Sequence, residues 1–352
     1  MKHVFVVHSN ITYLISLGVI SKEKYNLNDV LIISDGFSCN GPVPIVVVKT
    51  AANRTIMRSS FIRYIKLYFN PRYELYRELD NFLKGECFTA YVPVLHLIKK
   101  LVLLHPNCKQ FHFIEEGTAS YYTTMTFDEY AIVYNNKPWF YSKNLQGLID
   151  RLHTAYKEFG FRSGMIESIP ISYMNHDSAG RTFYCLSDDA YPALKYGKKV
   201  VLDLSLSLDS YIWKDTVLEL QNVCLWIGDP DVAGRYGYDS YEHCIIEKLI
   251  PAIGNNKLFI RYHYRENIRQ RKAFTGILDR YSVDYDFIDD KQIMELVFIK
   301  SKSCKCFSFA SSLSVYAKIL GHESYSIANG ISSLKKNIDE VMPCFSKFVT
   351  YL

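Results

Sequence analysis

The chain begins with Met1-Lys2-His3-Val4-Phe5-Val6-Val7-His8, a short run rich in β-branched and aromatic residues. Its apolar part is shorter than the roughly 7–15 apolar residues of a signal peptide, so we interpret it as the first strand of a fold. A helical pattern follows over residues 11–20, and a second strand pattern over residues 30–34. Strand patterns that alternate with helical patterns in this way predict a parallel sheet with crossover helices.

The alternation continues and predicts two α/β domains. In the first half we expect further strands at 45–49, 89–92 and 111–115, with helices at 55–67 and 94–103. In the second half we expect strands at 223–228, 257–262, 285–287 and 306–309, with helices at 241–250, 268–281, 292–300 and 313–320. The predicted product is two parallel-sheet domains with a cleft between them, in which ligands bind beyond the carboxyl ends of the strands.

The domain boundaries follow from breaks in this rhythm. The first domain is expected to cover residues 1–200 and the second residues 217–330, with the linker within Tyr191–Asp215. The aromatic-rich region 126–184, with a helix at 145–159, is interpreted as an elaboration over a sheet edge. Residues 331–352 form a C-terminal segment that could pack back across the domains.

Composition limits the class of protein. The 352 residues are 49% hydrophobic and 22% charged, which excludes wholesale disorder and is enough for two domains. Lysine and arginine total 41 against 36 acidic residues, and the net charge of +5 favours an anionic partner but is too small to indicate nucleic-acid binding. Nine scattered cysteines indicate a reducing compartment, and no apolar run approaches the ~18 residues of a membrane span.

Polar side chains follow three of the predicted strands. Glu115 and Glu116 end the strand at 111–115, and Gly117 opens a tight turn after them. Because adjacent carboxylates repel, one of them can gain the raised pKa of a general base. The alternative is that both supply negative charge near a helix N-terminus, where it is stabilising.

The other two strand ends lie in the second domain. His263 follows the strand at 257–262 between Arg261 and Arg265, a setting that suits a phosphate or, with a protonated ring, a leaving group. Ser311 and Ser312 stand between a strand and a helix, where hydroxyl and backbone N–H groups can bind an anion. The alternatives are a solvated loop histidine and ordinary N-capping by a serine.

These motifs and their order resemble the bacterial sialyltransferases of the lipooligosaccharide and capsular polysialyltransferase type. Those proteins share an acidic pair followed by glycine, then His-Pro, then Ser-Ser. Glu115-Glu116-Gly117 and Ser311-Ser312 match that pattern. The middle motif departs from that pattern, because His263 is followed by Tyr264 and not by proline. A His-Pro pair does occur at His105-Pro106, but it precedes the acidic motif and is interpreted as unrelated.

The resemblance implies a B-type glycosyltransferase fold with two Rossmann-like domains and an inverting transfer of sialic acid from CMP-sialic acid, without metal or cofactor. The acceptor is then a hydroxyl of a bacterial surface glycan: lipooligosaccharide, O-antigen (lipopolysaccharide biosynthesis) or capsule. Glu116 would be the general base, with Glu115 as the alternative, and His263 would stabilise the departing CMP phosphate. The implied donor-binding residues are Ser311, Ser312, Glu295, Gly228, Arg265 and Asn10.

Two other functions stay open at this point. One is a B-type transferase that uses another nucleotide sugar, with a hexose or Kdo donor; Tyr264 favours it. The other is a non-catalytic glycan-binding protein with the same fold. Asp229-Pro230-Asp231 is interpreted as a structural turn and not as a D-x-D metal motif.

A basic stretch bears on partners and location. Between Asp35 and Glu74 every charged residue is basic, and aromatic residues are interleaved with them. This stretch suits peripheral contact with an anionic membrane or a glycolipid acceptor, although an ordinary amphipathic helix has the same pattern. We therefore expect a cytoplasmic protein at the inner face of the membrane, without a nucleic-acid partner; a homodimer is left open.

Overall fold

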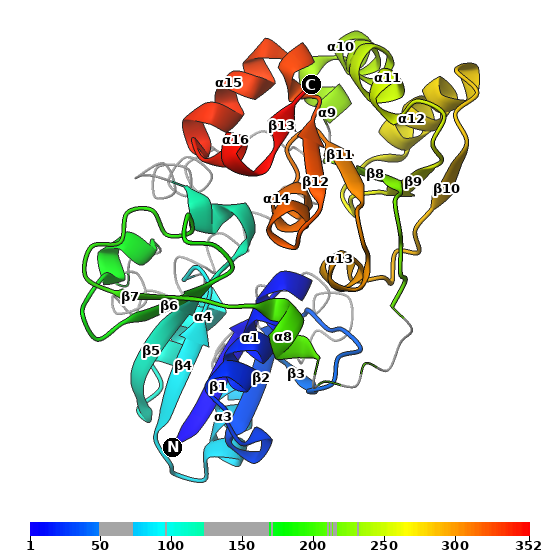
Figure 1. The fold of residues 1–352 in the computed structure, drawn as a ribbon. Coiled ribbons are helices and arrows are strands. Elements are labelled where there is room, and N and C mark those ends of the chain that lie inside the picture. Colours follow the sequence, from blue (N-terminus) through cyan, green and yellow to red (C-terminus); the bar gives the residue numbers. More distant parts are fainter. Residues whose placement is uncertain are drawn as a thin grey trace, which may run out of the picture. The chain divides into compact units, whose positions relative to one another are not determined.

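Two compact units make up the chain (Figure 1). Unit 1 comprises Met1–Ser120 and Thr124–Lys214, and unit 2 comprises Tyr121–Thr123 and Asp215–Leu352. The computed structural model describes residues 1–48, 73–95, 97–122, 172–209, 217–230 and 232–352, with isolated positions at 169, 211 and 213. The helices expected at 55–67 and 145–159, and the basic stretch from Lys49 to Arg72, lie outside the described residues.

Unit 1 is built on a parallel sheet of seven strands in the order β3-β2-β1-β4-β5-β6-β7. The strands are β1 (Lys2–Val7), β2 (Val30–Asp35), β3 (Ile45–Val48), β4 (Phe88–Val92), β5 (Cys108–Ile114), β6 (Thr182–Cys185) and β7 (Lys198–Val201). The first strand lies inside the sheet, where His3 pairs with Val30 on one side and with Thr89 on the other. Buried on both faces, β1 needs the continuous apolar run that the sequence shows.

Helices and short helical turns connect these strands. They are α1 (Asn10–Lys22), η1 (Leu27–Asp29), α3 (Tyr73–Leu83), α4 (Leu97–Leu103), η3 (Gly117–Tyr121), η4 (Tyr173–His176) and α8 (Leu204–Leu208). Ser9 caps α1, and Thr12 completes a capping box, so the helix starts directly after β1. A Cβ on Gly18 would lie 3.0 Å from Leu204 Cδ2, so the small residue lets α8 pack closely against α1.

Unit 2 repeats the architecture with six parallel strands in the order β10-β9-β8-β11-β12-β13. The strands are β8 (Cys224–Ile227), β9 (Leu258–Arg261), β10 (Tyr285–Phe287), β11 (Lys305–Ser308), β12 (Glu323–Ser326) and β13 (Thr350–Tyr351). The helices are α9 (Val232–Tyr236), α10 (Tyr238–Cys244), the π-helical η5 (Ile245–Leu249), α11 (Ile250–Ile253), α12 (Ile268–Arg280), α13 (Met294–Lys300), α14 (Ser312–Ile319), η6 (Ala328–Gly330), α15 (Ser332–Val341) and α16 (Phe345–Phe348).

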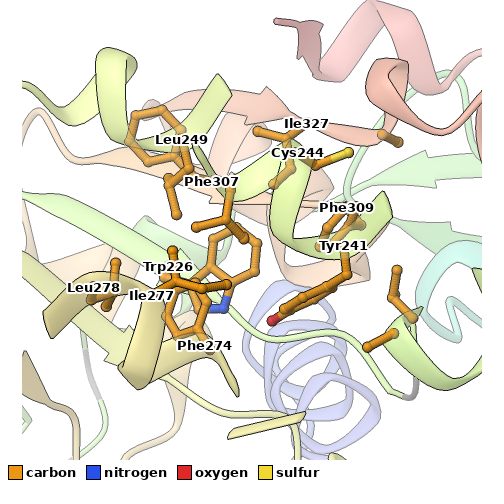
Figure 2. Packing of buried hydrophobic residues seen from close by; sticks show 14 of the residues in the cluster. Trp226, Tyr241, Cys244, Leu249, Phe274, Ile277, Leu278, Phe307, Phe309 and Ile327 are labelled. Carbon is orange, nitrogen blue, oxygen red and sulfur yellow. The ribbon is translucent and has the colours of Figure 1, made fainter. Parts of the chain in front are cut away.

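An aromatic core fills one face of the unit 2 sheet (Figure 2). Trp226 of β8 stacks on Phe274 of α12 with ring centroids 4.8 Å apart, and Tyr241 of α10 stacks on Phe309 at 5.4 Å. Leu225, the neighbour of Trp226, belongs instead to a second cluster that includes residues of α13 and α14. Successive residues of β8 therefore face opposite helical layers, as a strand pleat requires.

The predicted α/β class with two Rossmann-like units is confirmed by these two parallel sheets. Four strands were not predicted: β6, β7, β12 and β13. β6 lies in the region that we interpreted as an elaboration, and β7 lies within the candidate linker. Residues 331–352 belong to unit 2, where β13 pairs with β12 at the sheet edge.

Two further findings concern the chain's chemistry. All nine cysteines are free thiols. Within the described ranges, no helix is long and apolar enough to cross a membrane.

Candidate functional site

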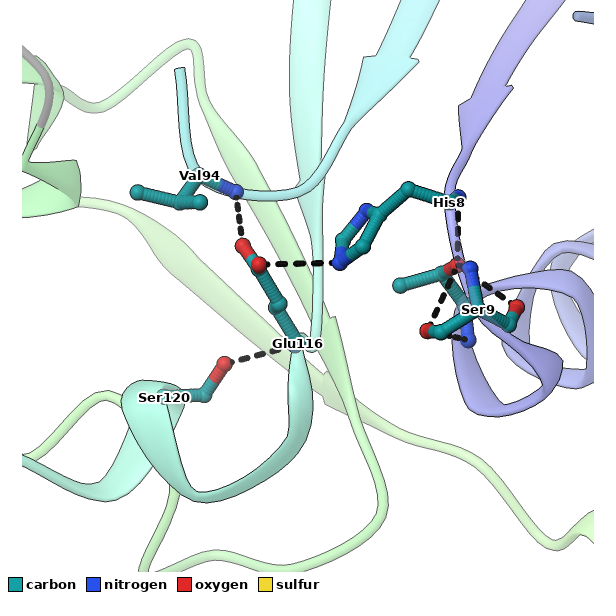
Figure 3. A network of polar contacts seen from close by, with 6 residues as sticks. His8, Ser9, Val94, Glu116 and Ser120 are labelled. Carbon is teal, nitrogen blue, oxygen red and sulfur yellow. Dashed lines mark hydrogen bonds and ion pairs between the residues drawn. The ribbon is translucent and has the colours of Figure 1, made fainter. Parts of the chain in front are cut away.

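The carboxyl ends of β1, β4 and β5 bring three residues of unit 1 together (Figure 3). Glu116 follows β5, and its Oε2 accepts a hydrogen bond from the backbone N–H of Val94, which follows β4, at 2.8 Å. Its Oε1 lies 2.9 Å from Nε2 of His8, which follows β1. The carboxylate is therefore held at both oxygens by groups from two neighbouring strands.

Local turns fix both partners of this contact between His8 and Glu116. Gly117 has φ +56°, a left-handed conformation that suits glycine, and it turns the chain directly after Glu116. Ser120 Oγ then accepts the backbone N–H of Glu116 at 2.8 Å. On the other side, the backbone N–H of His8 donates to Thr12 Oγ1 at 3.1 Å, which couples the histidine to the start of α1.

The two adjacent glutamates have different environments. Glu115 is completely buried, and its Oε2 accepts the backbone N–H of Leu186, just beyond β6, at 2.7 Å. The Glu116 side chain keeps 19% of its surface exposed. Glu115 therefore links β5 to the segment after β6, whereas Glu116 is the carboxylate that a small molecule can reach.

A buried lysine adds positive charge near Glu116. Lys99 of α4 is only 5% exposed, and burial lowers the pKa of its ammonium group. The negative charges of Glu116 and Asp35 act against that shift. Glu116 thus has a histidine in direct contact and a buried lysine within electrostatic range.

His263 is the centre of the predicted site in unit 2. Its Nδ1 accepts the backbone N–H of Arg265 at 3.1 Å, so a neutral ring carries its proton on Nε2. Burial lowers the pKa of His263, and Arg265, Arg261 and Arg271 lower it further. The arrangement favours a neutral imidazole whose Nε2–H is a hydrogen-bond donor.

Gly228 lies directly against this loop. A Cβ at this position would stand 2.2 Å from Glu266 Oε2 and 2.8 Å from the backbone nitrogen of His263. The backbone N–H of Gly228 also donates to the Arg261 carbonyl at 2.8 Å. Glycine is therefore required by the close approach of the β8 end to the β9 end.

A buried polar network surrounds that contact. Gln270 of α12 donates from Nε2 to Glu266 Oε1 at 2.8 Å and to the Asp229 carbonyl at 2.9 Å. Asp229 in turn accepts the backbone N–H groups of Phe309 and Ala310 at 2.8 and 3.3 Å. Burial raises the pKa of Asp229 to about 7. Asp229 thus joins the ends of β8 and β11, in keeping with a structural turn.

The serine pair starts α14. Ser311 is the N-cap residue, and its Oγ accepts the backbone N–H of Leu313 at 3.4 Å. Ser312 is the first residue of the helix, and Ser308 and Ser314 share a buried hydrogen bond of 2.6 Å between their hydroxyls. The capping that we gave as the alternative is present, and Ser311 is largely buried.

The remaining predicted residues occupy distinct places. Glu295 lies in the first turn of α13, is 6% exposed, and has its pKa raised to about 7 by burial. Arg265 is exposed, and its guanidinium lies 5.1 Å from the Tyr264 ring centroid. Asn10 is the first residue of α1, two positions after His8.

Each unit therefore gathers part of the predicted set. Unit 1 holds Glu116, Glu115 and Asn10, and unit 2 holds Gly228, His263 and Arg265 around one loop, with Ser311, Ser312 and Glu295 on neighbouring helices. The predicted cleft between the domains stays a prediction. Over the described positions, no group of three or more His, Cys, Asp or Glu side chains is placed to hold a metal ion.

Three residues of the unit 1 site were not predicted from sequence: His8, Val94 and Lys99. His8 follows a strand in the same way as Glu116 does, so the strand-end rule applied to β1 would have found it. Val94 acts through its backbone, which leaves no mark in the sequence. Lys99 is the first of two adjacent lysines on a short helix, and nothing local distinguishes it from Lys100.

Known proteins resemble this one in their fold, which has two Rossmann-like units in one chain. No known protein family and no curated protein sequence matches the chain. A 2,6-sialyltransferase of the Vibrionaceae, from Photobacterium sp. JT-ISH-224, solved with CMP and lactose, aligns over 99% of this chain and 78% of its own, at 12% identity and a TM-score of 0.49.

Two other solved structures have a comparable likeness. A UDP-GlcNAc 2-epimerase from Methanocaldococcus jannaschii covers 100% of this chain and 89% of its own at 12% identity and a TM-score of 0.49. The glycotransferase of kitacinnamycin covers 100% and 86% at 8% identity and a TM-score of 0.46. At these values the likeness is confined to architecture and says nothing about activity.

Replacing Gly228 tests the close approach in unit 2. Gly228→Ala places a methyl group against Glu266 and the His263 backbone, and we expect it to lower the free energy of unfolding by about 1–3 kcal/mol. The control is Gly276→Ala within α12, where a Cβ meets nothing within 4 Å. That change should stabilise by about 0.5–1 kcal/mol in urea titrations. Equal effects of the two substitutions would contradict the packing.

Glu295 gives a pH-dependent prediction. The folded chain keeps a proton on Glu295 up to about pH 7, whereas the unfolded chain releases it near 4.5, so the free energy of unfolding falls as pH rises between these values. Glu295→Gln should therefore stabilise by up to about 3 kcal/mol at about pH 8 and leave stability unchanged at about pH 4. Denaturant titrations at both pH values measure this.

The control for that prediction is Glu340→Gln on α15, where the carboxylate is exposed and 3.8 Å from the Lys336 ammonium. It should change stability to a similar, small extent at both pH values. A gain from Glu295→Gln that is the same at acid and alkaline pH would show that the carboxyl group is not buried in the folded chain.

Proposed function

We propose that the chain is an inverting sialyltransferase that moves sialic acid from CMP-sialic acid to a hydroxyl group of a bacterial surface glycan. The observation that carries the proposal is the Glu116 carboxylate, which Val94 and His8 hold at the carboxyl edge of a parallel sheet. A partly exposed carboxylate fixed in this way has the geometry of a general base. The sequence motifs around it support the choice of donor.

In the proposed reaction, Glu116 takes the proton of the acceptor hydroxyl. A carboxylate oxygen has two lone pairs, so it can accept a hydrogen bond from a substrate O–H as well as one from a protein donor. The acceptor oxygen forms a bond to the anomeric carbon of sialic acid as the bond from that carbon to the phosphate oxygen breaks. The bonding electrons leave with CMP, the proton stays on Glu116, and the anomeric configuration inverts.

Unit 2 has groups suited to the departing phosphate. A neutral His263 with its proton on Nε2 is a hydrogen-bond donor, and Arg265 beside it supplies positive charge. The N-terminus of α14 at Ser312 is the positive end of the helix dipole, which suits an anion. A nucleoside monophosphate carries less charge than a diphosphate, so we propose a reaction that needs no metal or cofactor.

One observation favours a second candidate, a B-type glycosyltransferase with another nucleotide sugar. Tyr264 stands where the sialyltransferases have proline, and its side chain is 77% exposed beside His263. A hexose or Kdo donor is the proposed alternative on this ground. The surface glycan as acceptor is also a proposal. So is contact with the inner face of an anionic membrane, which rests on the basic stretch in the sequence.

Donor cleavage tests the proposal directly. Incubated with CMP-sialic acid and lactose, the protein should release CMP and form a sialylated product at the same rate with and without EDTA. Glu116→Gln keeps the shape of the side chain but not its basicity, and we expect kcat to fall by roughly 10²–10⁴-fold. His263→Ala should also reduce kcat, because the leaving phosphate loses a donor. Product formation followed by mass spectrometry gives these rates.

Three outcomes would contradict parts of this proposal. Cleavage of a UDP- or GDP-sugar or CMP-Kdo, but not of CMP-sialic acid, would assign the second candidate. An active Glu116→Gln protein would move the base elsewhere. An absence of cleavage with all of these donors would indicate a glycan-binding protein. Circular dichroism of each variant shows whether a loss of activity reflects misfolding.

His8 gives a separate prediction about the orientation of Glu116. His8→Leu removes the donor to Oε1, and we expect kcat to fall at least about tenfold and the acidic limb of the kcat profile to move to higher pH. His8→Gln can still donate to the carboxylate and should recover most of the rate. If both variants lose the same activity with no change in the pH profile, His8 has only a packing role.

A further inference from the structure

A cavity of about 630 Å³ lies at the opposite edge of the unit 1 sheet, around the amino ends of β5 and β6. Its lining includes Lys109, Gln110 and Phe111 of β5, together with Ser178 and Arg181 from the segment before β6. β5 runs from Cys108 at this edge to Ile114 beside Glu116, a span of about 20 Å. The cavity is therefore separate from the candidate catalytic site.

Arg181 is fixed in place by uncharged groups. Its Nη1 donates to the carbonyl of Phe111, and its guanidinium lies 3.4 Å from the centroid of the Phe111 ring. Its Nε is buried and has no hydrogen-bond partner among the described residues. A half-buried guanidinium held in this way is preorganised, because little side-chain entropy remains to be lost when it binds a ligand.

The charge of Arg181 has no carboxylate to balance it in the described part of the chain. Burial lowers the pKa of the guanidinium; the Cys108 thiol acts against that shift, and no Asp or Glu side chain of the described residues does so. Asp177, four residues earlier, has its carboxylate occupied by the backbone N–H groups of Lys195, Tyr196 and Gly197. Lys109 adds a second positive charge to the cavity. A partly buried cation that has no carboxylate partner among the described residues favours an anionic ligand.

The size and the other lining groups indicate which anion fits. A volume of about 630 Å³ is in the range of small-molecule sites and far larger than a bare ion needs. Ser178 and Gln110 supply polar groups for hydroxyls, and His176 and Phe111 supply ring surfaces. We propose that this cavity binds a carboxylate-bearing sugar, with the carboxylate held by Arg181 and Lys109.

The test compares D-glucuronic acid with D-glucose, which differ in the carboxylate, by titration calorimetry and saturation-transfer NMR on the full chain. We expect the wild-type protein to bind glucuronate and not glucose. Arg181→Gln should weaken binding at least about tenfold, because it removes a charge-assisted contact. Lys109→Gln, at an exposed position, should weaken it by a smaller factor.

Two controls separate this site from the proposed reaction. Lys198→Gln on β7 removes a nearby positive charge that does not line the cavity, and it should leave glucuronate binding unchanged. Glu116→Gln should also leave it unchanged, so an inactive enzyme does not disturb the result. Equal binding of glucose and glucuronate, unchanged affinity in both cavity variants, or tighter binding of inorganic phosphate than of glucuronate would each overturn the proposal.

Discussion

The order of the strands determines where each unit can gather polar groups. In each of these parallel sheets, strands are added first on one side of the first strand and then on its other side. At the pair of neighbouring strands where this switch occurs, the loops after the two carboxyl ends run in opposite directions and leave space for a ligand. That pair is β1 and β4 in unit 1 and β8 and β11 in unit 2. In both units a carboxylate binds at this place: Glu116 contacts the residues after β1 and β4, and Asp229 joins the ends of β8 and β11.

The two carboxylates, Asp229 and Glu116, differ in their exposure to solvent. Asp229 is buried, accepts two backbone N–H groups, and has its pKa raised to about 7, so it stabilises the junction between the ends of β8 and β11. Glu116 is partly exposed and has a histidine as partner. Within the acidic pair of unit 1 the same contrast appears again, because Glu115 faces the interior and Glu116 does not. Directly after β5, two adjacent positions thus hold a buried structural carboxylate and one that solvent can reach.

The sequence predicts the parts of this protein that depend on local pattern. Central strands such as β1 and β8 are buried on both faces and carry continuous apolar runs, so they are recognisable. β12 has a single aromatic residue among three polar ones and β13 has only two residues, so neither has such a run. Glu116 and His263 are found because they follow recognisable strands. The contact of His8 with Glu116 depends on pairing between distant segments, which a single sequence does not show.

The outer strand of the unit 1 sheet has a further consequence. β7 pairs with β6 on one side, and it begins with Lys198 and Lys199. An edge strand presents free backbone N–H and C=O groups that can recruit a strand of another molecule. Two long charged side chains at that edge make such a docking costly, since each would have to give up its hydration. The lysines at the start of β7 therefore disfavour the docking of another strand at this edge of the described sheet.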